Sequence, residues 1–102
     1  MEPGKPKIRV VAAVIERDGH YLITQRRPSA IMPLLWEFPG GRVEGGETDA
    51  VALARELADR MGIAVRVGDE LMSLVKEYDG YVIDFHVYLC QLLSDEISKL
   101  LI

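Results

Sequence analysis

Residues 41–63 read GRVEGGETDAVALARELADRMGI, a glycine-rich turn followed by a run with helical spacing. Apolar residues recur every three or four positions in this run, which predicts an amphipathic helix over 48–61. Thr48 or Asp49 can cap its start, and Gly62 is typical of a helix end. A glycine-rich loop joined to a helix that carries carboxylates can hold a divalent metal against a pyrophosphate.

The segments around this stretch predict strands. Residues 8–16, IRVVAAVIE, form an almost unbroken apolar and β-branched run, which is typical of a strand buried on both faces. Further strands are expected over 21–25, 36–38, 64–67, 71–76 and 81–92. Strands with one strong helix after the third favour a mixed sheet packed on that helix, in the α/β or α+β class. Residues 1–7 are expected to be a flexible N-terminal arm, and 8–102 a single domain.

The last predicted strand has two different faces. One face is apolar, and the other is polar and is expected to be wetter; they carry, respectively, Ile83, Phe85, Val87 and Leu89, and Asp84, His86 and Tyr88. His86 is interpreted as a sheet residue satisfied by its neighbours, with a role as a base as the alternative. Cys90 in the same run is expected to be a buried thiol.

Composition limits the classes of partner and location. The net charge is −4 without a basic block, which argues against duplex nucleic acid as a partner. The single cysteine excludes an internal disulfide, and no apolar run is long enough to span a bilayer. The N-terminus lacks an apolar signal core, so the cytoplasm is the expected location and no membrane partner is expected.

Two carboxylates on the predicted helix suggest a chemistry. Glu56 and Asp59 are three residues apart and are therefore neighbours on one helix face, where they can share a hard cation such as Mg²⁺. A bound metal lowers the pKa of water and stabilises a leaving phosphate, so this arrangement suggests hydrolysis of a phosphoanhydride. The alternative is that Glu56 and Arg60 form an ordinary i,i+4 ion pair on an exposed helix.

The spacing resembles the Nudix box: glycine, five residues, glutamate, seven residues, Arg-Glu-apolar, one residue, two glutamates, one residue, Gly-apolar. The matching residues are Gly41, Glu47, Arg55, Glu56, Leu57, Gly62 and Ile63. The flanking stretches VVAAVIERDG, LITQRR and LWEFPGGRVEGGE are similar to the MutT branch, the nucleoside triphosphate and oxidised-nucleotide hydrolases. The resemblance covers residues 8–92, and matches at fixed spacing make it specific.

This resemblance implies a fold and a reaction. The fold would be a Nudix-like α/β/α sandwich, a mixed sheet with the box helix on one face, here truncated at the C-terminus. The reaction would be Mg²⁺-dependent hydrolysis of a nucleoside diphosphate linked to a further group, with Mn²⁺ as a substitute metal. The nucleotide substrate would be a (d)NTP or an oxidised (d)NTP, cleaved to a nucleoside monophosphate and pyrophosphate.

The resemblance also implies roles for individual residues. The metal ligands would be the Gly40 carbonyl and the carboxylates of Glu56 and Asp59. Glu56 is also the candidate general base. An ion pair between Glu47 and Arg55 would support the site by holding the loop against the helix, and Arg26 would bind the nucleotide.

Two departures from the family pattern leave alternatives open. Arg60 stands where the box has its second glutamate, so it is expected to swing away toward solvent or substrate, and metal binding is expected to be weaker. By the resemblance, family members continue past a loop like Ser94 to Ile102 into another strand and a last helix, which this sequence does not include. The chain is therefore expected either to be shortened or to form a homo-oligomer that completes the sheet edge. The alternatives to an enzyme are a nucleotide-binding or sensing module without turnover, and a structural fragment or assembly subunit.

Overall fold

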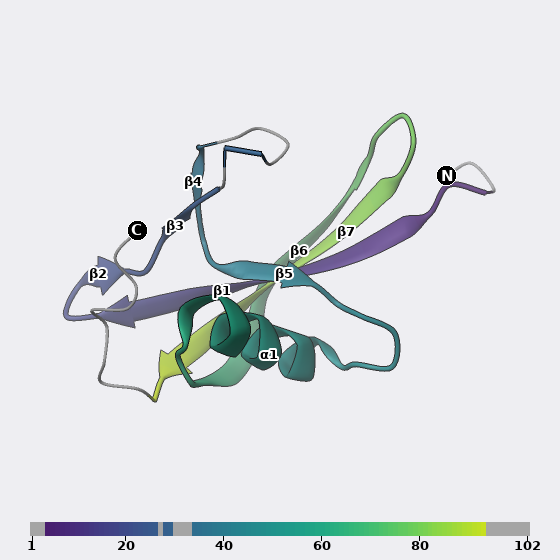
Figure 1. Ribbon diagram of the computed structural model, residues 1–102. Helices are drawn as coiled ribbons and strands as arrows, with labels where there is room; N and C mark the ends of the chain where they lie inside the picture. Colours follow the sequence, from purple (N-terminus) through teal and green to yellow (C-terminus); the bar gives the residue numbers. More distant parts are fainter. Residues whose placement is uncertain (1–3, 27, 30–33, 94–102) are drawn as a thin grey trace.

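A computed structural model describes residues 4–26, 28–29 and 34–93 of the chain (Figure 1). Helix α1 (Asp49–Met61) lies against a mixed sheet. The strands are β1 (Lys7–Arg17), β2 (His20–Tyr21), β3 (Thr24–Gln25), β4 (Trp36–Glu37), β5 (Gly40–Arg42), β6 (Val65–Glu77) and β7 (Val82–Leu92). This arrangement confirms the predicted α+β class. No helix in the described part of the chain has the length and apolar character to span a membrane.

Strand β1 is the centre of the main sheet, whose order is β2-β1-β7-β6. One edge of β1 pairs in parallel with β7 from Lys7 to Ile15, and the other edge pairs antiparallel with β5 and β2. Val11, Ala12 and Ala13 are consecutive and all buried, which confirms the prediction of a strand covered on both faces. At the N-terminal end of β1, the Pro6 carbonyl accepts a hydrogen bond from the Val82 amide.

The predicted helix is confirmed almost residue for residue. The Thr48 side chain accepts a hydrogen bond from the Val51 amide, and Gly62 ends the helix with a left-handed φ of 67°. Leu53 and Leu57 are fully or almost fully buried and pack in one core cluster with Val11, Ala13 and Ile15 of β1. Burial of each leucine side chain contributes about 1.5–3 kcal/mol, so this apolar stripe holds the helix on the sheet.

The prediction of one returning strand over 21–25 is wrong. Strand β2 pairs only with the end of β1, and β3 belongs to a separate two-stranded sheet with β4. The cause lies in a later part of the chain: β5 pairs with β1 at Val10 to Ala12, and the Pro39 carbonyl accepts from the Ala13 amide. Because Pro39 and β5 pair with this edge of β1 from Val10 to Ala13, the returning strand cannot extend along it.

The two strands predicted over 64–67 and 71–76 are one strand, β6, which pairs antiparallel with β7. The register shifts between Val67 and Glu70 and again between Glu70 and Met72, as in a β-bulge. A Cβ atom at Gly68 would lie 2.9 Å from the Leu89 carbonyl oxygen, so glycine allows the strands to approach there. The interval between the two predicted strands is therefore an irregular part of one long strand. In Figure 1 the turn that joins β6 to β7 lies far from α1, whereas the other end of these strands lies near the helix.

The prediction that the polar face of the last strand is the wetter one is also wrong. Asp84 is only 9% exposed, whereas Leu89 on the opposite face is 46% exposed. The polar face is covered because Asp84 pairs with Arg9 and Tyr88 hydrogen-bonds to the first residue of α1. Cys90 is buried as expected, and burial raises the pKa of its thiol to about 11.

Candidate functional site

The loop before α1 is held to the helix by Arg55. Its Nε donates to Glu47 Oε2 at 2.6 Å and its Nη2 to Glu47 Oε1 at 3.0 Å, which is a bidentate pair. The same Nη2 donates to the Arg42 carbonyl at 3.1 Å, and Glu44 Oε1 lies 3.6 Å from it. These hydrogen bonds from Arg55, together with one from the Glu44 amide, hold the pKa of Glu47 below its usual value. The structure thus forms the ion pair expected between Glu47 and Arg55.

Glu56 is the buried carboxylate of the site. The residue is 8% exposed although it lies on the helix, and both of its oxygens accept from guanidinium groups. Arg55 Nη1 lies 2.9 Å from Oε2 and Arg60 Nε lies 2.5 Å from Oε1. A Cβ atom at Gly41 would lie 2.3 Å from Glu56 Cδ, so the glycine lets the carboxylate pack against β5.

The position of Arg60 contradicts one expectation. It does not swing away from the site, because it forms the i,i+4 ion pair with Glu56 that was the alternative interpretation of these residues. Its side chain remains 56% exposed, so the guanidinium covers one Glu56 oxygen from the solvent side. Burial makes an uncompensated charge on Glu56 costly, and Arg60 supplies a second cationic partner beside Arg55.

Asp59 lies beside Glu56 but faces solvent. Its Oδ2 is 3.9 Å from Arg55 Nη1, the atom that also contacts Glu56, and its side chain is 70% exposed. The two carboxylates predicted to share a cation therefore approach one common point. Arg55 Nη1 lies at that point in this structure.

The remaining predicted site residues are on strands. Gly40 in β5 pairs with Ala12, and a Cβ atom there would lie 2.0 Å from the Val11 carbonyl oxygen. The close approach of β5 to β1 therefore explains why a residue without a Cβ stands at position 40. Arg26 follows β3, and its Nη1 lies 3.2 Å from Glu37 Oε1 on β4. The structure places Arg26 on the small β3–β4 sheet, and its contact with a nucleotide stays a prediction.

The donor chemistry of this site fits a hard cation. Glu56 and Asp59 supply carboxylate oxygens and β5 supplies carbonyls, which are the ligands that Mg²⁺ prefers. Each carboxylate oxygen has two lone pairs, so Glu56 can accept one hydrogen bond on each oxygen and still offer a lone pair to a metal. Arg55 and Arg60 contact the same Glu56 oxygens, and their positive charges weaken the binding of a metal ion there.

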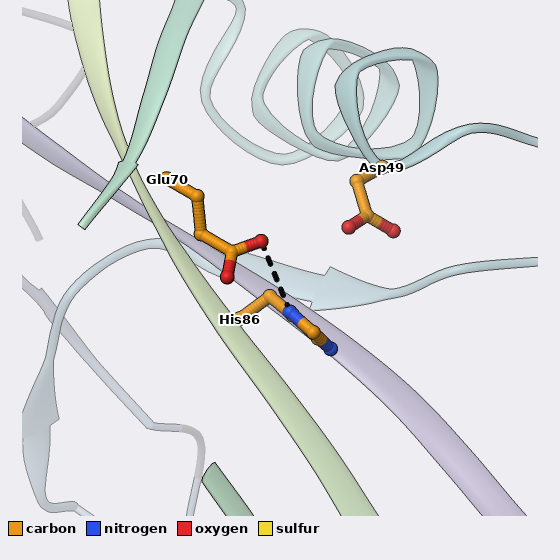
Figure 2. Close-up of side chains that lie close together, drawn as sticks. All are labelled: Asp49, Glu70 and His86. Atoms are coloured by element: carbon orange, nitrogen blue, oxygen red, sulfur yellow. Dashed lines mark hydrogen bonds and ion pairs between the residues drawn. The ribbon is translucent and has the colours of Figure 1, made fainter. Parts of the chain in front are cut away.

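A second polar cluster lies at the start of α1 (Figure 2). One ligand atom each from Asp49, Glu70 and His86 lie within 4.8 Å of one another. These groups already have partners: Asp49 binds Arg9, while His86 Nε2 lies 2.9 Å from Asp84 and Nδ1 lies 3.2 Å from Glu70. The interpretation of His86 as a sheet residue satisfied by neighbours is confirmed.

Sequence reasoning missed this second cluster. Asp49 was considered only as a helix cap, and Glu70 and Arg9 carried no predicted role. Asp49, Glu70 and His86 are distant in sequence. They meet because β6 and β7 are neighbours in the sheet and the start of α1 lies near them. The one local signal was the alternation of Asp84, His86 and Tyr88 on a single strand face.

Comparisons with known proteins give the same assignment as the motif. A family model described as NUDIX domain matches residues 10–100. The chain is 44% identical over 81 residues to the CTP pyrophosphohydrolase of Escherichia coli strain K12, covering 79% of this chain and 60% of that protein. It is 36% identical over 86 residues to the 8-oxo-dGTP diphosphatase of Haemophilus influenzae, covering 83% of this chain and 63% of that protein.

Solved structures share the fold. The solution structure of the E. coli ORF135 protein matches with a TM-score of 0.75 and 38% identity, covering 94% of this chain and 72% of that one. The crystal structure of the MutT protein from Methanosarcina mazei Go1 matches with a TM-score of 0.80 and 26% identity, covering 92% and 70%. The chain spans less than two thirds of the length of both curated relatives named above. With the family model matched over nearly all of its residues, this chain belongs to the Nudix domain family.

Proposed function

We propose that the protein hydrolyses nucleoside triphosphates, including oxidised ones, to a nucleoside monophosphate and pyrophosphate with the help of Mg²⁺. One observation carries the proposal: Glu56 is a buried carboxylate seated against Gly41 and fixed by an arginine that also holds the Glu47 loop. Burial and fixed orientation of a carboxylate are typical of a catalytic group. Membership of the Nudix domain family supports this interpretation.

The substrate class is supported by the named relatives. A CTP pyrophosphohydrolase and several 8-oxo-dGTP diphosphatases are 31–44% identical to this chain. Both names describe release of pyrophosphate or cleavage of the phosphate chain of a nucleoside triphosphate. We therefore propose a pyrimidine or an oxidised purine nucleoside triphosphate as the substrate. We also propose that the protein acts in the cytoplasm.

The chain's own residues would divide the work as follows. Glu56 accepts the proton of the attacking water through a carboxylate oxygen, and Arg55 fixes the orientation of that carboxylate. Glu47 holds Arg55 in place and the loop against the helix. Asp59 and the Gly40 carbonyl would complete the set of metal ligands with Glu56. Mg²⁺, or Mn²⁺ in its place, would neutralise phosphate charge and acidify water when bound.

Arg26 is proposed to bind the nucleotide from the β3–β4 sheet. Its guanidinium is a planar group with five donors and suits a phosphate or the edge of a base. Its ion pair with Glu37 would keep the Arg26 side chain in place until the substrate arrives. Replacement of Arg26 by alanine should therefore raise the KM for the nucleotide and leave Mg²⁺ affinity unchanged.

Product analysis tests the proposal. The protein would be incubated with CTP, dGTP and 8-oxo-dGTP, in Mg²⁺ or in excess chelator, and monophosphate and pyrophosphate would be quantified. From CTP or 8-oxo-dGTP we expect equal amounts of both products, formed only with metal, with dGTP as the unoxidised comparison. Saturable nucleotide binding without metal-dependent products would instead show a nucleotide-binding module, the alternative that the Arg60–Glu56 contact favours.

A further inference from the structure

All three nitrogens of the Arg9 guanidinium on β1 hydrogen-bond to carboxylates near the start of α1. Its Nε lies 2.6 Å from Asp49 Oδ1 and its Nη2 lies 2.7 Å from Asp49 Oδ2, so the two groups form a parallel, bidentate pair. The third nitrogen, Nη1, lies 3.1 Å from Asp84 Oδ2 on β7. Asp49 is the first residue of the helix, and its side chain is 12% exposed.

The Arg9 backbone contacts the other end of the same loop. The Arg9 carbonyl oxygen accepts a hydrogen bond of 2.9 Å from the Val43 amide. Residues 43–48, which we call the β5–α1 loop, therefore have both ends tied to one residue of β1. Arg55 ties the interior of this loop through Glu44 and Glu47.

The surroundings keep the Arg9 side chain in this position. Tyr88 donates a hydrogen bond to Asp49, and His86 Nε2 lies 2.9 Å from Asp84 Oδ1. Lys7 Nζ lies 3.8 Å from the Asp84 oxygen that Arg9 contacts. With one carboxylate at each end of its guanidinium, Arg9 is confined by partners on two elements.

We infer that Arg9 is a positioning residue, whose side chain acts through Asp49 to set the β5–α1 loop at the spacing that the metal and pyrophosphate require. This inference rests on the proposed function. The hydrogen bonds of the Arg9 side chain go to Asp49 and Asp84, so Arg9 acts on the loop from β1, whereas Arg55 acts on it from α1. The two arginines hold the loop between the sheet and the helix.

Hydrogen exchange and metal titration of matched variants test this inference. The variants are Arg9→Gln, Asp49→Asn and the double change, with Lys5→Gln as the control. Lys5 is a cation on the same N-terminal segment, and it pairs with Glu77 at 3.2 Å, away from the loop. In Arg9→Gln we expect faster amide exchange within residues 43–48 and a Mg²⁺ affinity lowered about three- to tenfold, as for one lost charge-assisted contact.

Three further results would support a positioning role. The double variant should lose less than the sum of the two single losses, because both single changes remove the Arg9–Asp49 pair. Excess Mg²⁺ should restore much of the lost rate, which a general loss of folding would not allow. Lys5→Gln should match the wild type in loop exchange, Mg²⁺ affinity and rate.

The outcomes separate this inference from the proposed function. If exchange in 43–48 and Mg²⁺ affinity are the same in Arg9→Gln as in Lys5→Gln, the inference is overturned even when the protein is an active hydrolase. If the wild type forms no product, the proposed function fails. Loop exchange and Mg²⁺ affinity then still decide whether Arg9 positions the loop.

Discussion

Arg60 Nε lies 2.5 Å from Glu56 Oε1, so an arginine one helical turn further along neutralises the carboxylate on which the proposed reaction depends. Family members have a glutamate at this position, according to the resemblance of the sequence to the Nudix box. The arginine puts a positive charge in place of a negative one beside the proposed metal ligands. If Glu56 and Asp59 bind a cation as proposed, its affinity should depend strongly on residue 60.

Arg60→Glu is expected to raise Mg²⁺ affinity by about tenfold, or ~1.4 kcal/mol, because it removes a positive charge near the cation and adds a ligand oxygen. Arg66→Glu is the matched control: it changes the net charge equally on β6, where Arg66 Nη1 lies 3.4 Å from Gln91 Oε1. Calorimetric titration with Mg²⁺ would compare the two. Equal affinities in both variants would show that Arg60 does not control the site.

Glu56→Gln should lower kcat by roughly 10²- to 10⁴-fold, the usual contribution of a general base, while the fold is retained. The amide is nearly isosteric but cannot take up a proton from water. Glu44→Gln is the control. Glu44 is a loop carboxylate whose side chain is 70% exposed, and its Oε1 lies 3.6 Å from Nη2 of Arg55, the arginine that also contacts Glu56. An equal loss of rate in both variants would remove Glu56 from the mechanism.

Gly41→Ala should destabilise the protein by about 1–3 kcal/mol, because its Cβ would lie 2.3 Å from Glu56 Cδ and force that side chain to move. Gly45→Ala provides the comparison, since a Cβ there would have no neighbour within 4 Å. Thermal unfolding would measure both changes.

The same clash predicts coupling between the two residues. When Glu56→Ala is already present, Gly41→Ala should cost much less, because the side chain it meets is absent. Additive losses of stability would show that Gly41 is required for another reason.

Asp49 gives a pH-dependent prediction. The hydrogen bonds from Arg9 lower its pKa to about 2, below the ordinary aspartate value of about 3.9. Ionised Asp49 therefore contributes stability above its unfolded pKa, and this contribution is lost as the pH falls through the folded pKa. The stability advantage of the wild type over Asp49→Asn should be constant above about pH 5 and shrink between about pH 4 and 2.

Denaturant unfolding across this pH range would test the prediction. Asp79→Asn, in the exposed bend between β6 and β7, is a suitable control because it removes the same charge elsewhere. A stability difference for Asp49→Asn that does not change between pH 6 and pH 2 would contradict the role assigned to the Arg9 pair.

The sequence predicted the features that depend on local spacing. The helix, its Thr48 cap and its Gly62 end follow from neighbours within four residues, and the pairing of Glu47 with Arg55 follows from the box. Gly40 was expected to supply a metal-ligating carbonyl, and Gly41 to match the box. The structure shows a packing reason for each glycine, against β1 and against Glu56, and the ligand role of Gly40 stays a prediction.

The features that sequence analysis got wrong depend on distant residues. Strands β2 and β3 separate because Pro39 and β5 occupy the edge of β1, which nothing within residues 21–25 can indicate. The polar face of β7 is covered because Arg9 and Asp49 meet it from other elements. The orientation of Arg60 is decided by the burial of Glu56, which depends on the tertiary fold.

The central claim is that Glu56 helps to hold a divalent cation despite its contact with Arg60. Calorimetric titration of the wild type and Glu56→Gln with Mg²⁺ or Mn²⁺, with and without a non-hydrolysable nucleoside triphosphate, tests it most directly. The account predicts saturable cation binding by the wild type that strengthens with nucleotide and is much weaker in Glu56→Gln. Absence of cation uptake by the wild type under both conditions, or equal uptake by the two proteins, would contradict it.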